Sequence, residues 1–435
     1  MRANALRQIL LRVVPALLVP VALYCVAAEW AGLARLRLVG YDYAFFYYAF
    51  QTVLGHGATW STMYDAHAQQ AFLARLGYPF IPHNQYVYPP QFAYLLAPLG
   101  WLPFRLSFGL WAITSAMMYF CGVYWLIRLL WGYVSRPFFW LVLLAAALLT
   151  PFEFDLGVGN INSILFSLVS LTFYLLYHKH RERWAGLPLG LAIMFKVTPA
   201  AVLVMFLILR RWTTCVWTIL CVAAGTAMTM LAAGPYTLWQ YATHFTSFGR
   251  TSMGNGPAPY NQSIIGIMGL LQAHHWLMPS HALQTISFVL FASVTAYAIY
   301  RVVESPIRSD WRLDMAIASL SPLLFSPLVE QPHMVLALPA LFVLWKIAAE
   351  AVDQERTSVR WMLAAVAAGC SLGMSLPATF VANLVVHRWP SWFLVQGRMF
   401  AVLTAVFVTV VWLHARSPRF GQRNLLQSTQ EAYRA

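Results

Sequence analysis

The sequence predicts an all-α polytopic membrane protein with about twelve membrane-spanning helices. Hydrophobic residues make up 60% of the chain and charged residues only 10%, whereas a soluble domain has roughly 25% charged residues. Apolar stretches recur from one end to the other, and the mean hydropathy is +0.63. Aromatic residues reach 15%, with 18 tryptophans, which fits rings placed at both membrane interfaces. We therefore expect one integral membrane domain over residues 1–415 and a cytoplasmic tail over residues 416–435.

The net charge of +14 is distributed over short loops between apolar stretches. Such a distribution marks cytoplasmic loops and is not a binding patch, so nucleic-acid binding is disfavoured. The five cysteines all lie in apolar stretches, with neither a Cys-x-x-Cys pair nor a histidine at ligand spacing. Cysteines of this kind are small core residues, so the sequence predicts neither disulfides nor a metal site.

The first span is expected at Ile9–Ala28, after Arg2, Arg7 and Arg12. No small-residue cleavage site follows it, so we expect an uncleaved first helix. The positive-inside rule then places the N-terminus in the cytoplasm and the following loop, residues 29–103, outside.

This outer loop is too polar in its middle to cross a bilayer, and it is rich in aromatic residues. The rings of Tyr41–Phe50 predict an amphipathic surface at headgroup depth. The stretch Gln91–Trp101 is too short to span ~30 Å and predicts a second interfacial helix. Asp42 lies among the rings with no basic neighbour in sequence. The residues alone leave two roles open for it, a cap on a helix that begins at Tyr43 or a functional carboxylate.

The remaining spans follow from the apolar stretches and the basic loops between them. They are expected at Phe104–Ile127, Pro137–Thr150, Ile161–Tyr177, Thr213–Ala233, Ala282–Tyr300, Asp314–Phe325, Met334–Ala349, Trp361–Leu376 and Arg398–His414. A loop is expected from Gly234 to about Trp276. Both ends of the chain are then cytoplasmic.

The stretch Gly186–Leu209 is as long as one span but has basic clusters on both sides. Both clusters should be cytoplasmic, which a single crossing does not allow. A hairpin of two short helices removes the conflict and puts Lys196 at its tip, on the outer side. These two short helices complete the twelve predicted spans.

The polar residues gather on the outer side of this predicted topology. They are Asp42, Glu153, Asp155, Asn160, Lys196, Arg250, Glu330 and His333. The spans themselves have almost no charge at mid-depth, whereas an ion-coupled transporter keeps ionisable groups near the midplane. The distribution favours an enzyme that acts on a lipid-linked substrate at the outer membrane surface.

Six stretches in this order resemble glycosyltransferase family 87, the polyprenol-phosphate-mannose-dependent membrane mannosyltransferases of the C-type superfamily. They are GYDYAFFYYAFQTVLGHGATWSTMYD, YVYPPQFAYLLAPLGWLP, GVGNINSILFSL, GLPLGLAIMFKVTP, YNQSIIGIM and SPLVEQPHMVLALP. The resemblance extends to about Pro339 and implies the C-type glycosyltransferase fold. GVGNIN stands where the family often has Gly-Gln-x-Asn.

The resemblance also implies roles for individual residues. Asp42 matches the catalytic aspartate and is expected to take the proton of the acceptor hydroxyl. Lys196 is expected to contact the donor phosphate as a point charge, and His333 to donate to the phosphate or sugar. From the residues alone, Lys196 also fits a snorkelling lysine, and His333 a hydrogen-bonded buried histidine.

Further candidates for contacts with the donor phosphate or sugar are Tyr88, Asn160, Asn162, Arg250 and Asn261. The alternative roles are a solvated arginine for Arg250, and caps and turns for the others. Asp65 and Asp155 are expected to have structural roles only.

The implied reaction transfers a hexose, with mannose the implied sugar, from a polyprenyl-phosphate donor to a lipid or glycan acceptor. It takes place on the outer face of the cytoplasmic membrane, among membrane lipids, by one inverting displacement with Asp42 as the base. No metal or other cofactor is expected beyond this lipid-linked co-substrate.

Two other classes remain open. A transporter or flippase of lipid-linked saccharides suits twelve spans but not the long outer loop or the lack of an internal repeat. A non-catalytic protein of cell-envelope assembly would tolerate loss of Asp42.

Overall fold

The computed structural model describes residues 19–21, 23–56, 62–79, 84–254, 261–273, 275–304, 310–350, 357–376 and 397–416. These residues are mostly helical and contain no strand, which confirms the all-α prediction. Residues 23–35 are helical. The later elements are α2 (Tyr41–Leu54), α3 (Ala66–Arg75), α4 (Pro90–Leu96), η2 (Ala97–Trp101), α5 (Phe104–Trp131), α6 (Arg136–Ala147), α7 (Thr150–Val158), α8 (Asn162–Phe173), η3 (Tyr174–His178), α9 (Glu182–Phe195), α10 (Ala200–Ile208), α11 (Trp212–Ala233), α12 (Pro235–Gly254), α13 (Ile264–Ala273), α14 (His281–Val303), α15 (Trp311–Leu324), η4 (Gln331–Ala337), α16 (Leu338–Glu350), α17 (Thr357–Ser375) and α20 (Arg398–Arg416).

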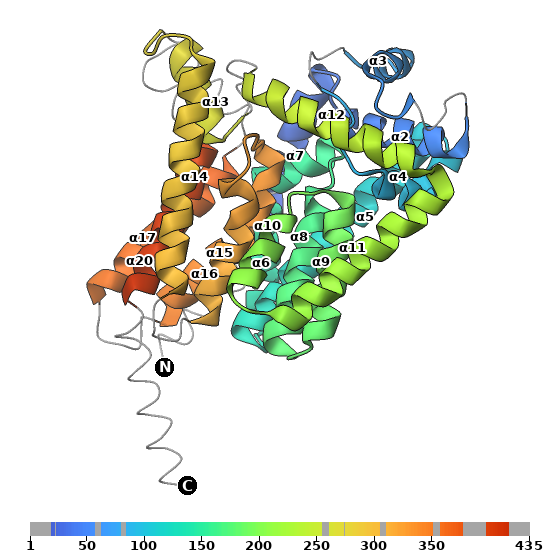
Figure 1. Ribbon diagram of the computed structural model, residues 1–435. Helices are drawn as coiled ribbons and strands as arrows, with labels where there is room; N and C mark the ends of the chain where they lie inside the picture. The colour runs from blue at the N-terminus through green and yellow to red at the C-terminus, as the bar shows by residue number, and fades with distance from the viewer. Residues whose placement is uncertain are drawn as a thin grey trace.

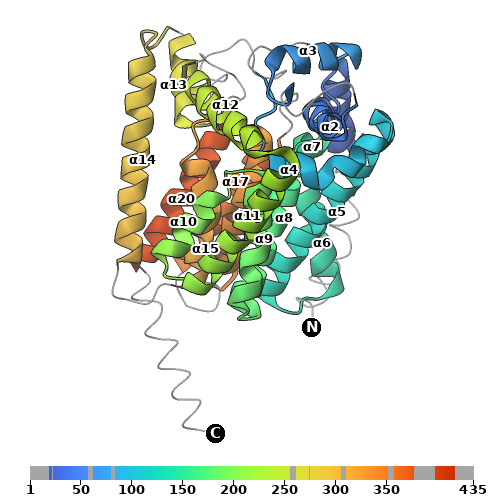
Figure 2. The ribbon, with the colours of Figure 1, turned by 45° about the vertical axis from the view of Figure 1, so that its right-hand side comes forward.

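The helices have two kinds of arrangement in the molecule. Helices such as α5, α11 and α14 run along its length, whereas α2, α3 and α12 lie together at one end (Figures 1 and 2). Five helices are long and apolar enough to cross a membrane, and the pair α6 and α7, bent by 60°, makes a sixth if it is one span. The polytopic character is confirmed, but the count of twelve is not confirmed among the described residues. The helices α8 and α15, each predicted as a span, are too short to count among these, and α9 and α10 are the two short helices predicted for the hairpin.

The positions of the long spans follow the hydropathy closely. The helices α5, α11, α14 and α20 each begin within one residue of the predicted start. A long apolar stretch bounded by polar residues has few other ways to satisfy its backbone hydrogen bonds in a membrane.

The hairpin predicted over Gly186–Leu209 is present. The helices α9 and α10 are separated at Lys196, and Nη1 of Arg211 lies 3.5 Å from Oε1 of Glu182 at the other end. The start of α9 and the end of α10 therefore lie side by side, with Lys196 at the tip.

Small residues fix the hairpin against α11. A Cβ on Gly190 would lie 2.6 Å from Cβ of Cys221, and one on Gly186 would lie 2.7 Å from Cβ of Trp217. Contacts that short exclude any side chain, so the glycines let the two backbones approach closely.

The aromatic residues of α2 lie in the core, which corrects the predicted interfacial surface. Tyr43, Phe46 and Phe50 are fully buried. The ring centroid of Tyr43 is 5.6 Å from that of Trp111 in α5, and the centroid of Phe46 is 4.9 Å from that of Phe92 in α4. The aromatic content of α2 does not by itself distinguish burial in protein from contact with lipid.

The predicted loop from Gly234 to about Trp276 is also corrected, since α12 and α13 occupy most of it. In α12, the rings of Tyr241 and Phe245 lie 5.7 Å apart on one helix face, and Tyr241 also packs 5.8 Å from Tyr64. Polar residues between these rings keep the hydropathy below that of a span, so the sequence pattern predicts a loop here.

Candidate active site

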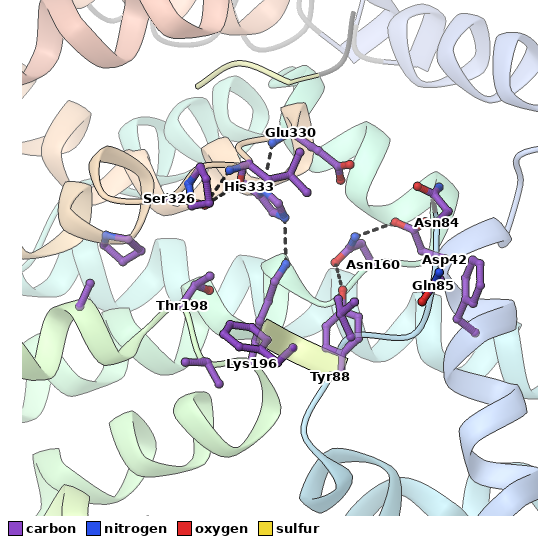
Figure 3. A pocket seen from close by; sticks show the side chains of 18 of the residues that line it. Asp42, Asn84, Gln85, Tyr88, Asn160, Lys196, Thr198, Ser326, Glu330 and His333 are labelled. Atoms are coloured by element: carbon purple, nitrogen blue, oxygen red, sulfur yellow. Dashed lines mark hydrogen bonds between the residues drawn. The ribbon is translucent and has the colours of Figure 1, made fainter. Parts of the chain in front are cut away.

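A cavity of about 320 Å³ lies where α2, the α9–α10 tip, the end of α15 and η4 meet. Polar side chains from all these elements converge on it (Figure 3). They are those of Asp42, Asn84, Gln85, Tyr88, Asn160, Lys196, Thr198, Ser321, Ser326, Glu330 and His333.

The lining is not uniformly polar. Thr198 and Ser326 lie on the far side of Lys196 from Asp42 (Figure 3). Apolar residues close to them in sequence also line the cavity: Val197, Ala201, Pro322, Phe325, Pro327 and Leu328. The lining beyond Lys196 is therefore more apolar than the lining near Asp42, where Phe45, Phe46 and Val87 lie among polar residues.

Asp42 is in the first turn of α2 and does not cap it. The helix begins at Tyr41, and the N-cap is Gly40, whose φ of +72° favours glycine. The Oδ2 atom of Asp42 instead accepts a hydrogen bond of 2.6 Å from Nδ2 of Asn160. The cap interpretation is wrong, and the carboxylate faces the cavity.

The pKa of Asp42 is raised to about 7. Removal of the carboxylate from water is the main cause, and the charge of Glu330 acts in the same direction. The hydrogen bond from Asn160 and the charge of Lys196 oppose the rise. A carboxyl that titrates near neutral pH is suited to accept a proton during a reaction.

Asn160 is held rigidly in the turn between α7 and α8. Its Oδ1 accepts hydrogen bonds from N of Ile161 at 2.7 Å and from Nδ2 of Asn162 at 2.9 Å. The hydroxyl of Tyr88 donates to the same oxygen at 3.2 Å. Three donors on Oδ1 fix the orientation of the amide, so Nδ2 must point to Asp42.

Asp155 anchors this turn from the last residues of α7. Its Oδ2 accepts from N of Ser163 at 2.8 Å, and its Oδ1 accepts from Nδ2 of Asn162 at 3.0 Å. The carboxylate thus satisfies donors at the start of α8 and is fully buried. Asp65 likewise caps α3, with bonds from N of His67 and Ala68. Both aspartates have the structural roles that were predicted.

Lys196 lies opposite Asp42 across the cavity. Its Nζ donates to Oδ1 of Asn162 at 3.2 Å, lies 2.8 Å from Nε2 of His333, and lies 5.5 Å from the ring centroid of Tyr88. Burial lowers its pKa to about 8, although the charges of nearby carboxylates act against that change.

His333 is positioned by the first turn of η4. The backbone N–H of Glu330 donates to Nδ1 of His333 at 2.9 Å, and this bond turns Nε2 toward Lys196. Glu330 and His333, which both line the cavity from this turn, are three positions apart in the chain.

The predicted site residues are therefore only partly brought together. Asp42, Tyr88, Asn160, Lys196 and His333 all line the cavity. Asn162 and Asn261 do not line it, and the side chain of Arg250 lies outside the described residues.

Asn261 is not among the lining residues. Its side chain joins its own segment to residues 327–329, through Nδ2 to O of Pro327 at 3.1 Å and from N of Val329 to Oδ1 at 3.1 Å. Arg250 is in α12, but its side chain lies outside the described residues. Glu153 is buried away from the cavity, with 1% of its surface exposed.

Six polar lining residues were not predicted as contacts: Asn84, Gln85, Thr198, Ser321, Ser326 and Glu330. Glu330 could have been suspected from its place three residues before His333, at the start of a helical turn. Asn84 and Gln85 belong to a non-helical segment before α4, and nothing in their local sequence indicates that it faces the cavity.

The arrangement offers a proton acceptor and, facing it, two nitrogen donors suited to an anion. Among the described residues, no three His, Cys, Asp or Glu side chains are grouped to hold a metal ion. The site can therefore support transfer of a group from an anionic leaving group to a hydroxyl.

Comparison with known proteins gives a consistent set of similarities. The model of glycosyltransferase family 87 matches residues 86–327, more than half of the chain. This stretch includes Tyr88, Asn160 and Lys196 but neither Asp42 nor His333. No solved structure matches the chain.

The curated relatives that match this chain have low sequence identity to it. A polyprenol-phosphate-mannose-dependent alpha-(1-2)-phosphatidylinositol mannoside mannosyltransferase of Mycolicibacterium smegmatis is 29% identical over 329 residues, covering 70% of this chain and 69% of the relative. A polyprenol-phosphate-mannose-dependent alpha-(1-2)-phosphatidylinositol pentamannoside mannosyltransferase of Mycobacterium tuberculosis is 23% identical, covering 76% and 73%. An alpha-(1->3)-arabinofuranosyltransferase of Corynebacterium glutamicum is 32% identical over a shorter stretch, 31% of this chain and 32% of the relative.

Proposed function

Because the chain belongs to glycosyltransferase family 87, we propose that it transfers mannose from a polyprenyl-phosphate donor to a lipid or glycan acceptor. Two relatives named for a polyprenol-phosphate-mannose donor and a phosphatidylinositol mannoside acceptor support this choice. The observation that supports it most directly is the cavity in which Asp42 faces the pair Lys196 and His333.

Asp42 is the base in this proposal. Its Oδ2 is engaged by Asn160, which leaves Oδ1 for the hydroxyl of the acceptor. The O–H bond of the acceptor breaks and its proton goes to Asp42, while its oxygen forms a bond to the anomeric carbon. The bond from that carbon to the phosphate oxygen breaks in the same step, and the electron pair leaves with the phosphate. One displacement of this kind inverts the anomeric configuration.

Lys196 and His333 bind the phosphate of the donor. Polyprenyl phosphate leaves as an anion, so no general acid is needed, but the growing negative charge needs donors around it. Nζ of Lys196 and Nε2 of His333 lie 2.8 Å apart, close enough to contact oxygens of the same phosphate. They stabilise the negative charge on the leaving group while Asp42 removes the proton of the attacking hydroxyl.

The apolar part of the cavity suits the first isoprene units of the donor. Val197 and Ala201 line it from the hairpin, and Pro322 and Phe325 line it from the end of α15. A phosphate on Lys196 would have its lipid chain on this side and its sugar on the side of Asp42. This orientation fits the proposed attack geometry.

A transfer assay tests the proposal. Purified protein in nanodiscs is incubated with labelled polyprenyl-phosphate mannose and phosphatidylinositol mannosides, and glycolipid products are identified by mass spectrometry. Polyprenyl-phosphate arabinofuranose is the competing donor, because one relative is named for that sugar. We expect mannose transfer by the native protein and its loss in Asp42→Asn. Transport of the donor without transfer would instead favour the flippase alternative.

The proposal places the cavity at the outer face of the cytoplasmic membrane. The supporting observation is that the ion pair of Glu182 with Arg211, beside the basic loop, lies at the opposite end of the hairpin from Lys196. Single cysteines at His67 and Arg183, in a protein without its native cysteines, test this with a membrane-impermeant thiol reagent on intact cells. Residue 67 should react and residue 183 should not. Reaction of both, or of residue 183 alone, would refute the orientation.

A further inference from the structure

The hydrogen bonds of His333 fix the position of its ring proton. Nδ1 accepts a bond of 2.9 Å from the backbone N–H of Glu330. A backbone N–H can only donate, so Nδ1 must present its lone pair. A neutral imidazole has one N–H, which must then be on Nε2, and an imidazolium would put a second proton against that of Glu330.

This tautomer leaves only one form of Lys196 that can bond to it. Nζ of Lys196 lies 2.8 Å from Nε2 of His333, where the ring N–H is a donor. An ammonium group has three N–H donors and no lone pair, so it cannot accept that proton. An uncharged amine can accept it, and the short contact between the two nitrogens is then a hydrogen bond.

The second contact of Lys196 is consistent with the same form. Nδ2 of Asn162 donates to Oδ1 of Asp155 and to Oδ1 of Asn160, so Oδ1 of Asn162 must face Nζ. An uncharged amine still has two N–H groups, and one of them donates to this oxygen. Every polar contact of Nζ is satisfied without a charge.

The charged groups around Lys196 act in both directions. Glu330 of the turn before η4, Asp155 of α7 and Asp42 of α2 favour the ammonium form, and burial opposes it. Burial has the larger effect, and the pKa of Lys196 falls to about 8. The uncharged amine, which the hydrogen-bond geometry requires, therefore predominates above about pH 8.

We propose that Lys196 is an uncharged amine in the donor-free cavity, held by Nε2–H of His333, and that binding of a phosphate ester brings one proton from solvent to it. The inference rests on the proposed function, in which this phosphate belongs to the donor. When the phosphate binds, its oxygens accept from both Nε2–H and the new ammonium. Donor binding is then coupled to proton uptake.

The charge in the donor-free protein can be tested without any ligand. The chain has only three lysines, Lys179, Lys196 and Lys346, so competitive acylation followed by mass spectrometry resolves each of them. Only the uncharged amine reacts, so the pH of half-maximal labelling reports the protonation of each lysine. We expect this pH to be lower for Lys196 than for the two reference lysines. An equal or higher value would overturn the proposal.

A second variant tests whether His333 is responsible. In His333→Gln the amide can turn its oxygen toward Nζ, which an ammonium group can then contact. Half-maximal labelling of Lys196 should move to higher pH in this variant. An unchanged value would show that burial alone keeps the amine uncharged and that His333 does not hold it.

Proton uptake on binding is measured by calorimetry in two buffers of different ionisation enthalpy. The ligand is a short-chain polyprenyl monophosphate at about pH 8.5, where a monoester with a second pKa near 6 is already fully ionised. The native protein should take up most of one proton. Lys196→Arg should take up none, because a guanidinium stays charged. Equal uptake by both proteins, or none by the native protein, would contradict the proposal.

These two measurements separate the inference from the proposed function. If the monophosphate does not bind, the proposed donor site fails, but the labelling still decides the charge of Lys196. If it binds with proton uptake and no sugar is transferred, the phosphate site stands and the transfer reaction fails.

Discussion

The two ends of the cavity are built in different ways. At the end of the cavity that contains Asp42, the contacts that orient the carboxylate come from one short turn. In this turn Asn160 and Asn162 are two residues apart. At the other end, Lys196 and His333 are 137 residues apart and meet because α10 and η4 both pack against α15. We call these the base end and the phosphate end.

The difference has a functional meaning. The base end is a network of side-chain amides whose orientations are fixed by hydrogen bonds with neighbouring groups. A change there therefore alters the proton transfer. The phosphate end depends on two long-range elements, so a change there alters binding of the donor and of the leaving group. Asn162 joins the two ends, because its amide contacts both Asn160 and Lys196.

The largest expected effect is at the base end. Asp42→Asn keeps the shape of the side chain and removes its basicity, so turnover should fall by ~10²–10⁴ while donor affinity stays close to normal. Asp65→Asn is the matched control, because asparagine also caps helices well and α3 should be unaffected. Turnover and donor binding are measured in nanodiscs. If Asp42→Asn kept more than half of the native turnover, Asp42 would not be the base.

The next effect is at the phosphate end. Lys196→Ala removes a charge-assisted contact worth about 1.5–3 kcal/mol, which corresponds to roughly 10- to 150-fold in catalytic efficiency. Lys196→Arg should recover part of the loss, since charge matters more here than the shape of the donor group. Lys346→Ala is the control, because that lysine pairs with Glu350 at 3.2 Å away from the cavity. Unchanged donor affinity in Lys196→Ala would return Lys196 to a snorkelling role.

A smaller effect is expected for Asn160, and it shows whether this residue positions Asp42 or only stabilises the fold. The bond from Asn160 lowers the pKa of Asp42, so Asn160→Ala should raise it further above its present value of about 7. The base must be ionised, so activity is lost as the pH falls through that pKa, and this acid limb should move to higher pH. At neutral pH the rate should fall roughly tenfold.

The control for this variant is Asn261→Ala. Asn261 bonds to the main chain of Pro327 and Val329 and does not line the cavity, so its loss should lower the thermal stability without moving the acid limb. The pH–rate profiles and melting temperatures of both variants are compared with those of the native protein. The same acid limb in all three proteins would show that Asn160 does not position or tune Asp42.

Sequence reasoning succeeded where one physical constraint dominated. Hydropathy located the long spans, and the two basic clusters around Gly186–Leu209 required the hairpin that puts Lys196 at its tip. The choice of Asp42 over a cap role needed the resemblance, because both roles fit an aspartate at the start of a helix. The convergence of His333 with Lys196 likewise came from the resemblance and could not be derived from spacing.

The failures have a common physical cause, which is that tertiary packing decides between environments of similar polarity. The aromatic face of α2 fits an interface as well as a core, and only its contacts with Trp111 and Phe92 show which is correct. Asn261 and Asn160 are both polar residues near a turn, yet only one reaches the cavity. No pattern in one sequence distinguishes them.

The smallest expected effect concerns Tyr88, which belongs to both ends. Its hydroxyl donates to Oδ1 of Asn160 at the base end, and its ring lies 5.5 Å from Nζ of Lys196 at the phosphate end. Tyr88→Phe removes only the hydroxyl, a neutral hydrogen bond worth about 0.5–1.5 kcal/mol, so turnover should fall by roughly 2- to 12-fold with unchanged donor affinity.

Replacing the whole ring distinguishes the two contacts. Tyr88→Leu also removes the face that the cation of Lys196 contacts in the donor complex, a contribution of about 0.5–2 kcal/mol, so donor affinity should fall as well as turnover. The ring packs 4.7 Å from Phe46, so the melting temperature of Tyr88→Leu is measured to separate local unfolding from lost binding. If Tyr88→Phe weakened donor binding as much as Tyr88→Leu does, the hydroxyl would act at the phosphate, and the separation of the two ends would have to be abandoned.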